Sequence, residues 1–268
     1  MTHPYALSQA DLETYARDGV LVLRDVVPAS VRDELRSLFA ETVDRLATQW
    51  HREGFISDTC EALPFETRFA ALREQLPARF PTSWRKILVS PTVYQLWQLP
   101  QLVGPVRSLL GDELYAHGVW NGRPREPNNP VQKVLWHQDA HYYRDWDPAD
   151  GGLVSVWIPL VAVDEQSACL EMALGSHRQG QFPRFRGENR LFTVADEHLQ
   201  GFPHKAMVME PGDALLFTDT TLHQSLDNTS DHVRWSIDIR FGPATPEIIS
   251  KTPRGYYCFS ERDPSRVE

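Results

Sequence analysis

The sequence predicts a mainly β protein with N-terminal helices, in which the strands form a sandwich or jelly roll. Two observations lead to this fold class. Up to about residue 110, apolar residues recur at helical spacing behind helix-start signals. From about Tyr115 onward, short apolar or alternating segments are separated by Gly, Pro, Asn and Asp, a pattern typical of antiparallel strands.

The expected helices lie in the first part of the chain. Gly19 is a suitable helix stop before the apolar run 20–23. Further helices are expected at residues 65–76 and 91–110, the last closed by Gly111. Two pairs of residues with the spacing of a capping box mark earlier helix starts: Ser8 with Asp11, and Ser30 with Asp33.

The strands are expected after the helical part, and we expect the Pro-rich segment 122–130 to be a loop between two of them. No repeat or flexible linker divides the chain, so residues 1–268 are interpreted as one domain, with a helical layer at about 1–110 and a jelly-roll core at about 115–242. The candidate strands are residues 115–119, 131–137, 154–161, 169–172, 206–209, 214–217 and 233–241.

Charge and cysteine content narrow the class of protein. The 36 acidic residues outnumber the 27 basic ones and give a net charge of −9, which argues against nucleic acid as a partner. The three cysteines form no CxxC pair, so neither a disulfide framework nor a zinc knuckle is indicated. With no visible secretory signal and no apolar run of membrane-spanning length, we expect a soluble, cytoplasmic protein without a membrane partner. The sequence does not indicate the oligomeric state.

A candidate metal site begins in the segment Trp136-His137-Gln138-Asp139. His137 and Asp139 are two residues apart, so their side chains point to the same face of an extended strand and can reach one ion. Two histidines and a carboxylate on one face of an octahedral ion leave positions open for substrates, as in non-haem iron oxygenases, although catalytic zinc also accepts such ligands. By itself, an HxD tripeptide is weak evidence, because such pairs arise by chance on strands and turns.

The downstream sequence adds the other candidate residues. A turn at 210–213 leads into the apolar strand 214–217, and His223 follows shortly after it. Arg234 comes 11 residues after His223, across a turn-rich segment, so a hairpin can place the two side chains on neighbouring strands.

Polar and apolar residues alternate along 233–241. Such a strand usually turns its polar face to solvent, but in a jelly roll that face can line a central cavity. There, the Arg234 guanidinium could hold a carboxylate through two hydrogen bonds, with Ser225 as a neighbouring hydroxyl donor.

Several motifs occur in a fixed order along this chain. They are the segments Val20-Leu21-Val22-Leu23-Arg24-Asp25, His137-Gln138-Asp139-Ala140-His141-Tyr142-Tyr143, Val156-Trp157-Ile158-Pro159-Leu160, Cys169-Leu170, Gly175-Ser176-His177 and Pro211-Gly212-Asp213, followed by His223, Ser225, Asn228 and Arg234. In this order they resemble the phytanoyl-CoA dioxygenase family of iron(II)/2-oxoglutarate oxygenases over about residues 20–241. Two positions depart from the family pattern: Ser167-Ala168 stands in place of Asn-Gly, and Leu174 stands in place of proline.

The resemblance implies a double-stranded β-helix, a jelly roll of the cupin type, buttressed by helices. It also implies a hydroxylase that uses Fe(II), 2-oxoglutarate and O2 on an unactivated C–H bond of a small organic substrate and releases succinate and CO2. Asp139 favours hydroxylation, because related halogenases have a small residue at this position. The implied site residues are His137, Asp139 and His223 as iron ligands, Arg234 and Ser225 at the distal carboxylate of 2-oxoglutarate, and Trp157 packed against that co-substrate.

Two questions stay open on the sequence. The aromatic group His141, Tyr142 and Trp146 follows the metal segment and is either core packing or a wall facing the substrate. The alternative function is a cupin-like metal or small-molecule binding protein without oxygenase activity, in which His137 and His223 hold a structural ion. Arg234 distinguishes the two, since a purely structural site needs no carboxylate-binding group.

Overall fold

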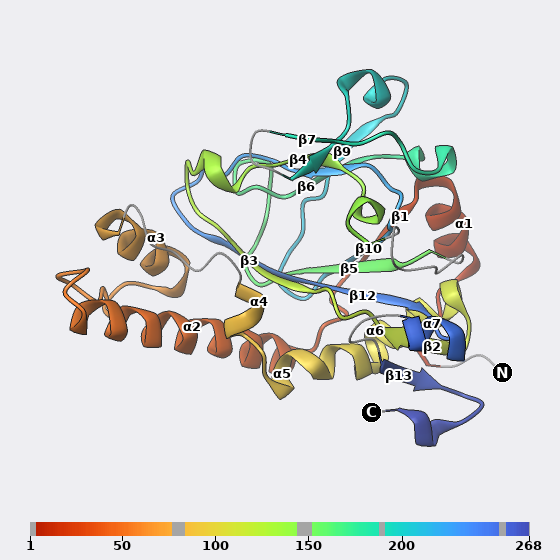
Figure 1. Cartoon of the computed structure of the whole chain (residues 1–268), viewed down its shortest axis with the longest axis horizontal. Helices are drawn as coiled ribbons and strands as arrows, with labels where there is room; N and C mark the ends of the chain where they lie inside the picture. Colours follow the sequence, from red (N-terminus) through yellow and green to blue (C-terminus); the bar gives the residue numbers. More distant parts are fainter. Residues whose placement is uncertain (1–3, 77–83, 144–151, 188–190, 252–255, 268) are drawn as a thin grey trace.

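The computed structural model describes residues 4–76, 84–143, 152–187, 191–251 and 256–267. Two antiparallel sheets face each other, and helices cover the outer face of the larger sheet (Figure 1). This arrangement confirms the predicted fold class, a jelly roll buttressed by helices.

The larger sheet has seven strands and runs in the order β1-β10-β5-β12-β2-β13, with β3 also paired to β12. The smaller sheet has the order β4-β11-β6-β9, and β7 and β8 form a separate hairpin. The strands of the larger sheet are β1 (Val20–Leu23), β2 (Glu113–Ala116), β3 (Asn121–Arg125), β5 (Val154–Pro159), β10 (Ala214–Thr218), β12 (Arg234–Pro243) and β13 (Tyr256–Ser260). The others are β4 (Val134–His137), β6 (Leu170–Ala173), β7 (Phe185–Arg186), β8 (Phe192–Thr193), β9 (His204–Ala206) and β11 (His223–Ser225).

The helices precede most of the strands. In Figure 1 α2, α5 and α6 lie below the larger sheet, α3 lies to its left above α2, and the smaller sheet lies above the larger one. The α-helices are α1 (Gln9–Asp18), α2 (Ala29–Arg52), α3 (Phe65–Gln75), α4 (Trp84–Ile87), α5 (Pro91–Tyr94), α6 (Pro100–Leu110) and α7 (Pro246–Lys251). The 3-10 helices are η1 (Gln95–Gln98), η2 (Pro130–Gln132), η3 (Asp139–Tyr142), η4 (Ser176–Gln179), η5 (Asp196–Leu199) and η6 (Pro264–Arg266).

The helix-start signals were correct once and wrong once. Ser8 and Asp11 form the predicted capping box at the start of α1, and Gly19 ends that helix with a φ of 74°. The pair at residues 30 and 33 does not cap α2, because this helix already begins at Ala29 behind Pro28. The helix expected at 91–110 is divided into α5, η1 and α6, with the last beginning at Pro100 because proline favours the first turn of a helix.

The expected loop at 122–130 was partly wrong, because β3 occupies its first residues and pairs with β12. Gly122 permits this strand to lie against the helical layer. A Cβ atom at Gly122 would lie 2.4 Å from Leu88 Cδ1 and 2.9 Å from Phe39 Cζ, so a side chain there would force the side chains of Leu88 and Phe39 to shift.

Aromatic side chains join the larger sheet to the helices. Trp235 of β12 lies at the centre of this cluster, with ring centroids 5.0 Å from Phe65, 5.4 Å from both Phe69 and Trp84, and 5.5 Å from Phe39. Because side chains alternate along a strand, Trp235 and its apolar neighbours face the helices while Arg234 and Ser236 face the smaller sheet.

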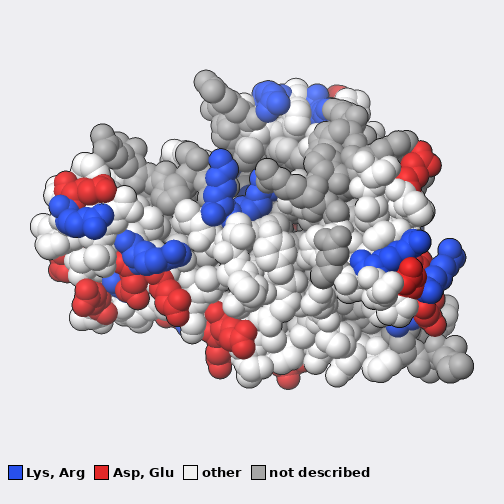
Figure 2. Space-filling view, turned by 60° about the horizontal axis from the view of Figure 1, so that its bottom comes forward, with Lys and Arg blue, Asp and Glu red and all other residues white. Residues whose placement is uncertain are grey.

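The described part of the chain has no helix that is both long and apolar enough to cross a membrane. On the face that Figure 2 shows, basic and acidic side chains lie close together at the two ends of the molecule, whereas the basic side chains near the top centre have few acidic neighbours among the described residues.

We predict that Phe39→Ala lowers the free energy of unfolding by about 3–5 kcal/mol, since it leaves a cavity against Trp84 and Trp235. Urea denaturation followed by fluorescence measures the change. Val131 is 79% exposed, so Val131→Ala is the control and should stay within about 0.5 kcal/mol of the parent. Equal effects of the two substitutions would contradict this account of the aromatic cluster.

Candidate metal centre

His137, Asp139 and His223 come together between the two sheets. His137 ends β4 and His223 begins β11, and the two are paired in register, so their rings lie side by side with centroids 4.2 Å apart. Asp139 follows two residues after His137, at the start of η3. Its Oδ1 lies 3.8 Å from His137 Nε2 and 3.9 Å from His223 Nε2, and the three candidate ligand atoms all lie within 4.8 Å of one another.

Backbone carbonyl groups orient both imidazole rings. His137 Nδ1 donates to the Leu135 carbonyl at 2.8 Å, and His223 Nδ1 donates to the Thr221 carbonyl at 2.9 Å, which leaves the Nε2 lone pairs facing Asp139. Burial lowers the pKa of both histidines, to about 3 for His137, where the neighbouring His223 adds to the effect. Both rings are therefore neutral at neutral pH, the form that binds a metal ion.

The Asp139 carboxylate is held by its other oxygen. Asp139 Oδ2 accepts hydrogen bonds from Ser155 Oγ at 2.7 Å and from Arg240 Nη2 at 2.8 Å and Nε at 3.1 Å. Burial raises the pKa of this carboxyl, but Arg240 and then the two histidines outweigh it, and the net pKa lies below the usual range. Two neutral imidazoles and one fixed carboxylate form the ligand set typical of non-haem iron.

The sequence reasoning missed Arg240 and Ser155. Arg240 also donates to Asp238 Oδ1 at 2.8 Å, and Asp238 accepts further bonds from Asn121 at 3.0 Å and Arg123 at 2.8 Å. The available signal was the alternation along β12, whose polar residues all lie on the inner face of the larger sheet and are buried there. They are Arg234, Ser236, Asp238 and Arg240.

Arg234 lies in the same enclosed space as the three candidate ligands. Its Nη2 donates to Ser225 Oγ at 3.1 Å, its Nη1 donates to Ser236 Oγ, and its Nε has no hydrogen-bond partner. The guanidinium carbon lies 5.4 Å from the centre of the Trp157 ring. These groups share a cavity of about 40 Å3 lined by Arg123, Val134, His137, Asp139, Trp157, Leu170, Phe217, His223, Ser225, Arg234, Asp238 and Arg240.

The three candidate substrate residues differ in their placement. Tyr142 borders the metal cluster, with its ring 5.9 Å from that of His137 and its hydroxyl accepting a bond from the Phe192 amide at 3.0 Å. His141 is buried, and its Nε2 lies 3.0 Å from the Phe182 carbonyl, so its ring packs away from the cavity lining. Trp146 lies outside the described residues.

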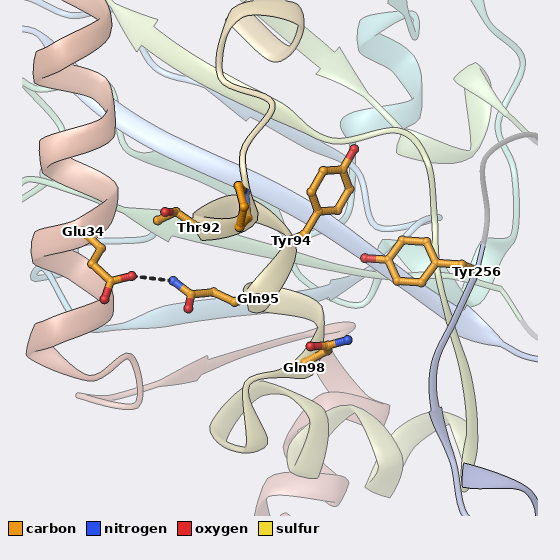
Figure 3. A pocket seen from close by; sticks show the side chains of 7 residues that line it. Glu34, Thr92, Tyr94, Gln95, Gln98 and Tyr256 are labelled. Carbon is orange, nitrogen blue, oxygen red and sulfur yellow. Dashed lines mark hydrogen bonds between the residues drawn. The ribbon is translucent and has the colours of Figure 1, made fainter. Parts of the chain in front are cut away.

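A larger hollow of about 580 Å3 lies between α2, α5, η1 and β13 (Figure 3). Among the described residues of its lining, the acidic one is Glu34, and it accepts a hydrogen bond from Gln95 Nε2 at 2.9 Å. Among the described residues, the group that can hold a metal ion is His137, Asp139 and His223. The larger of the two cavities is therefore not the one that contains the candidate metal site.

A family model described as phytanoyl-CoA dioxygenase (PhyH) matches residues 15–236. The chain belongs to the phytanoyl-CoA dioxygenase family. It is 22% identical over 245 residues to the peroxisomal phytanoyl-CoA dioxygenase of Homo sapiens. This match covers 88% of this chain and 68% of the human protein. It is 26% identical over 250 residues to the ectoine dioxygenase of Bordetella bronchiseptica, or 87% of this chain and 74% of that protein.

Solved structures share the fold of this chain. The structure of EctD from S. alaskensis with 2-oxoglutarate and 5-hydroxyectoine has a TM-score of 0.63 and 20% sequence identity, over 100% of this chain and 89% of that one. The likeness supports the jelly-roll assignment. Family membership and the His-Asp-His group confirm the expected enzyme class, a dioxygenase of the iron/2-oxoglutarate type.

We predict that Arg240→Met lowers the affinity for Fe(II) about 10- to 100-fold, since loss of a partner that orients a ligand typically has this effect. Arg240→Lys should lower it less, because it keeps the charge but not the two-point contact. Competition against a chromophoric chelator under anaerobic conditions measures the affinity, and circular dichroism checks the fold.

The matched control for Arg240 is Arg107→Met. Arg107 pairs with Asp112 and Glu261, both at 2.7 Å, near the start of β2 and the end of β13. This substitution should leave Fe(II) affinity unchanged. A folded Arg240→Met protein with the parent affinity would show that Asp139 needs no such support.

Proposed function

We propose that this protein is a hydroxylase that uses Fe(II), 2-oxoglutarate and O2 to oxidise an unactivated C–H bond of a small organic substrate, with release of succinate and CO2. One observation carries the proposal: the His137, Asp139 and His223 group shares an enclosed cavity with the buried guanidinium of Arg234. A structural ion needs the first of these features, but an oxygenase that takes a keto diacid needs both.

In this proposal His137 Nε2, His223 Nε2 and Asp139 Oδ1 bind the iron. The fit rests on two neutral imidazoles with their Nδ1–H groups already donated to backbone, and on a carboxylate whose second oxygen is held by Ser155 and Arg240. When bound, the iron supplies the activation of O2 that protein side chains cannot provide. The protein orients the ligands, keeps Asp139 ionised and limits access of water to the cavity.

Arg234, Ser225 and Trp157 form the proposed site for the distal carboxylate of 2-oxoglutarate. The Arg234 Nε is buried without a partner, and a buried donor of this kind is stabilised by an incoming acceptor. Ser225 already touches Arg234 and can donate its hydroxyl to the same carboxylate. The Trp157 ring lies beside the guanidinium and offers an apolar surface for the methylene carbons of the co-substrate.

The substrate is proposed to be a small molecule that enters beside Tyr142. This residue borders the metal cluster from η3 and is fixed through its hydroxyl to the β8 backbone. The relatives are named for phytanoyl-CoA and ectoine, which differ widely in size and chemistry, so family membership does not select one substrate. Asp139 supports hydroxylation as the outcome, since it keeps the third ligand position occupied by protein.

The proposal is tested by anaerobic titration with 2-oxoglutarate after loading with Fe(II). A visible metal-to-ligand absorption band should appear in the parent protein, and exposure to O2 should then release succinate. His137→Ala and Asp139→Ala should abolish both signals with the fold retained, because each removes a ligand. Asp231→Ala is the control, since the Asp231 side chain is 98% exposed, and it should behave as the parent.

For the co-substrate site, we predict that Arg234→Ala raises the 2-oxoglutarate concentration needed for half-maximal band formation roughly tenfold or more, since a charged hydrogen bond is lost. The Fe(II) affinity measured without 2-oxoglutarate should change little. Fe(II) binding without any 2-oxoglutarate band in the parent would instead favour the cupin-like metal-binding protein without oxygenase activity.

A further inference from the structure

Arg125 and Arg234 are neighbouring arginines in the interior. Arg125 of β3 is the register partner of Arg234 in β12. Directly opposite residues of antiparallel strands point to the same face, with Cβ atoms about 5 Å apart, and like charges in such pairs are destabilising. Arg125 is 3% and Arg234 is 2% exposed, so solvent does little to screen the two charges.

The hydrogen-bonding capacity of these two guanidinium groups is only partly used. Arg125 Nη2 donates to the Leu226 carbonyl at 3.2 Å, whereas Arg125 Nε and Nη1 and Arg234 Nε are buried without partners. Buried donors are nearly always paired in folded proteins, so three unpaired nitrogens in adjacent side chains need an explanation.

Protein carboxylates compensate this pair poorly. Asp227 Oδ1 lies 3.5 Å from Arg125 Nη2, but its side chain is 57% exposed and it also pairs with Lys133 at 3.2 Å. Among the described residues, Arg234 has no carboxylate oxygen within ion-pair distance. Burial, followed by the nearby Arg125, lowers the pKa of Arg234 to about 9, because both disfavour the charged guanidinium.

The Leu226 carbonyl connects Arg125 to the site proposed for the co-substrate. It accepts from Arg125 Nη2 and lies 3.4 Å from Ser225 Oγ, the same hydroxyl that accepts a bond from Arg234 Nη2. The backbone of Arg125 is also fixed, because its carbonyl accepts from Asn228 Nδ2 at 2.7 Å. Arg125 is thus held next to Arg234 and Ser225, which line this end of the cavity, while Arg125 itself is not among the lining residues.

We propose that Arg125 is a second cationic residue of the co-substrate site, and that it and Arg234 together attract the distal carboxylate of 2-oxoglutarate. The inference rests on the proposed function and adds a basis for selectivity. Two buried positive charges at this end of the cavity favour a keto acid that carries a second carboxylate over a keto acid that ends in a methyl group.

The experiment compares two keto acids in the Fe(II)-loaded protein without O2. The affinities for 2-oxoglutarate and for 2-oxobutyrate, which lacks the distal carboxylate, are measured from the absorption band. Arg125→Gln should weaken 2-oxoglutarate binding about tenfold and leave 2-oxobutyrate binding unchanged, which reduces selectivity by the same factor. Arg125→Lys should restore most of the selectivity, because it keeps the charge.

Arg73→Gln is the matched control. Arg73 pairs with Glu126, the residue after Arg125, at 3.1 Å, so its charge is already matched by a carboxylate and its loss should not change the selectivity. If Arg234→Ala reduces the selectivity and Arg125→Gln does not, the role of Arg125 is overturned and the proposed function stands. If the parent protein gives no band with either keto acid, the role of Arg125 and the proposed function are both overturned.

A second measurement needs no variant. In the metal-free parent protein, glutarate should raise the melting temperature, because it supplies a carboxylate for the two buried cations, whereas glutaramide, which has no carboxylate, should not when sodium chloride is added to equal ionic strength. No difference between the two compounds, in a protein that still forms the 2-oxoglutarate band, would overturn the role of the arginine pair.

Discussion

The buried ion pair between Arg240 and Asp139 fixes the centre of this structure. Arg240 comes from β12 in the larger sheet, and Asp139 follows β4 of the smaller sheet, so the pair links the two sheets at the metal cluster. A buried ion pair contributes little to stability unless its remaining hydrogen bonds are satisfied. Here Ser155 donates a further hydrogen bond to Asp139 Oδ2, the oxygen that Arg240 contacts, and Asp139 Oδ1 is directed at the two histidines. The interaction therefore acts mainly on ligand geometry.

The strand β12 connects this site to the helical layer. Its outward residue Trp235 packs among aromatic rings from α2, α3 and α4, while Arg234 and Ser236 on either side of it face the cavity. The position of the guanidinium therefore depends on how tightly the aromatic cluster holds the strand. This coupling explains why an enzyme with its chemistry between two sheets also has a large helical layer on one of them.

The sequence allowed the general fold and the candidate residues of the site to be predicted, because both depend on local periodicity and ordered motifs. The larger-scale errors came from tertiary contacts: the segment expected as a loop contains β3, whose Gly122 can lie against Phe39 and Leu88 only in the folded protein. Arg240 was missed because alternation alone does not show which polar face is buried. Ala168, which stands where the family usually has glycine, has a φ of 60°, a left-handed backbone conformation that glycine adopts without strain.

Net charge describes the surface of this protein and not its interior. The chain carries a net charge of −9, yet the paired strands β3 and β12 carry the buried residues Arg125, Arg234 and Arg240. Arg240 pairs with Asp139 and Asp238, and Asp238 also pairs with Arg123. Each of the two carboxylates is already paired with arginine, so positive charge remains at the end of the cavity near Ser225. In a space of low polarity, such an excess favours a ligand that brings its own negative charge. A negative net charge is therefore compatible with an anionic co-substrate that is held by buried arginines.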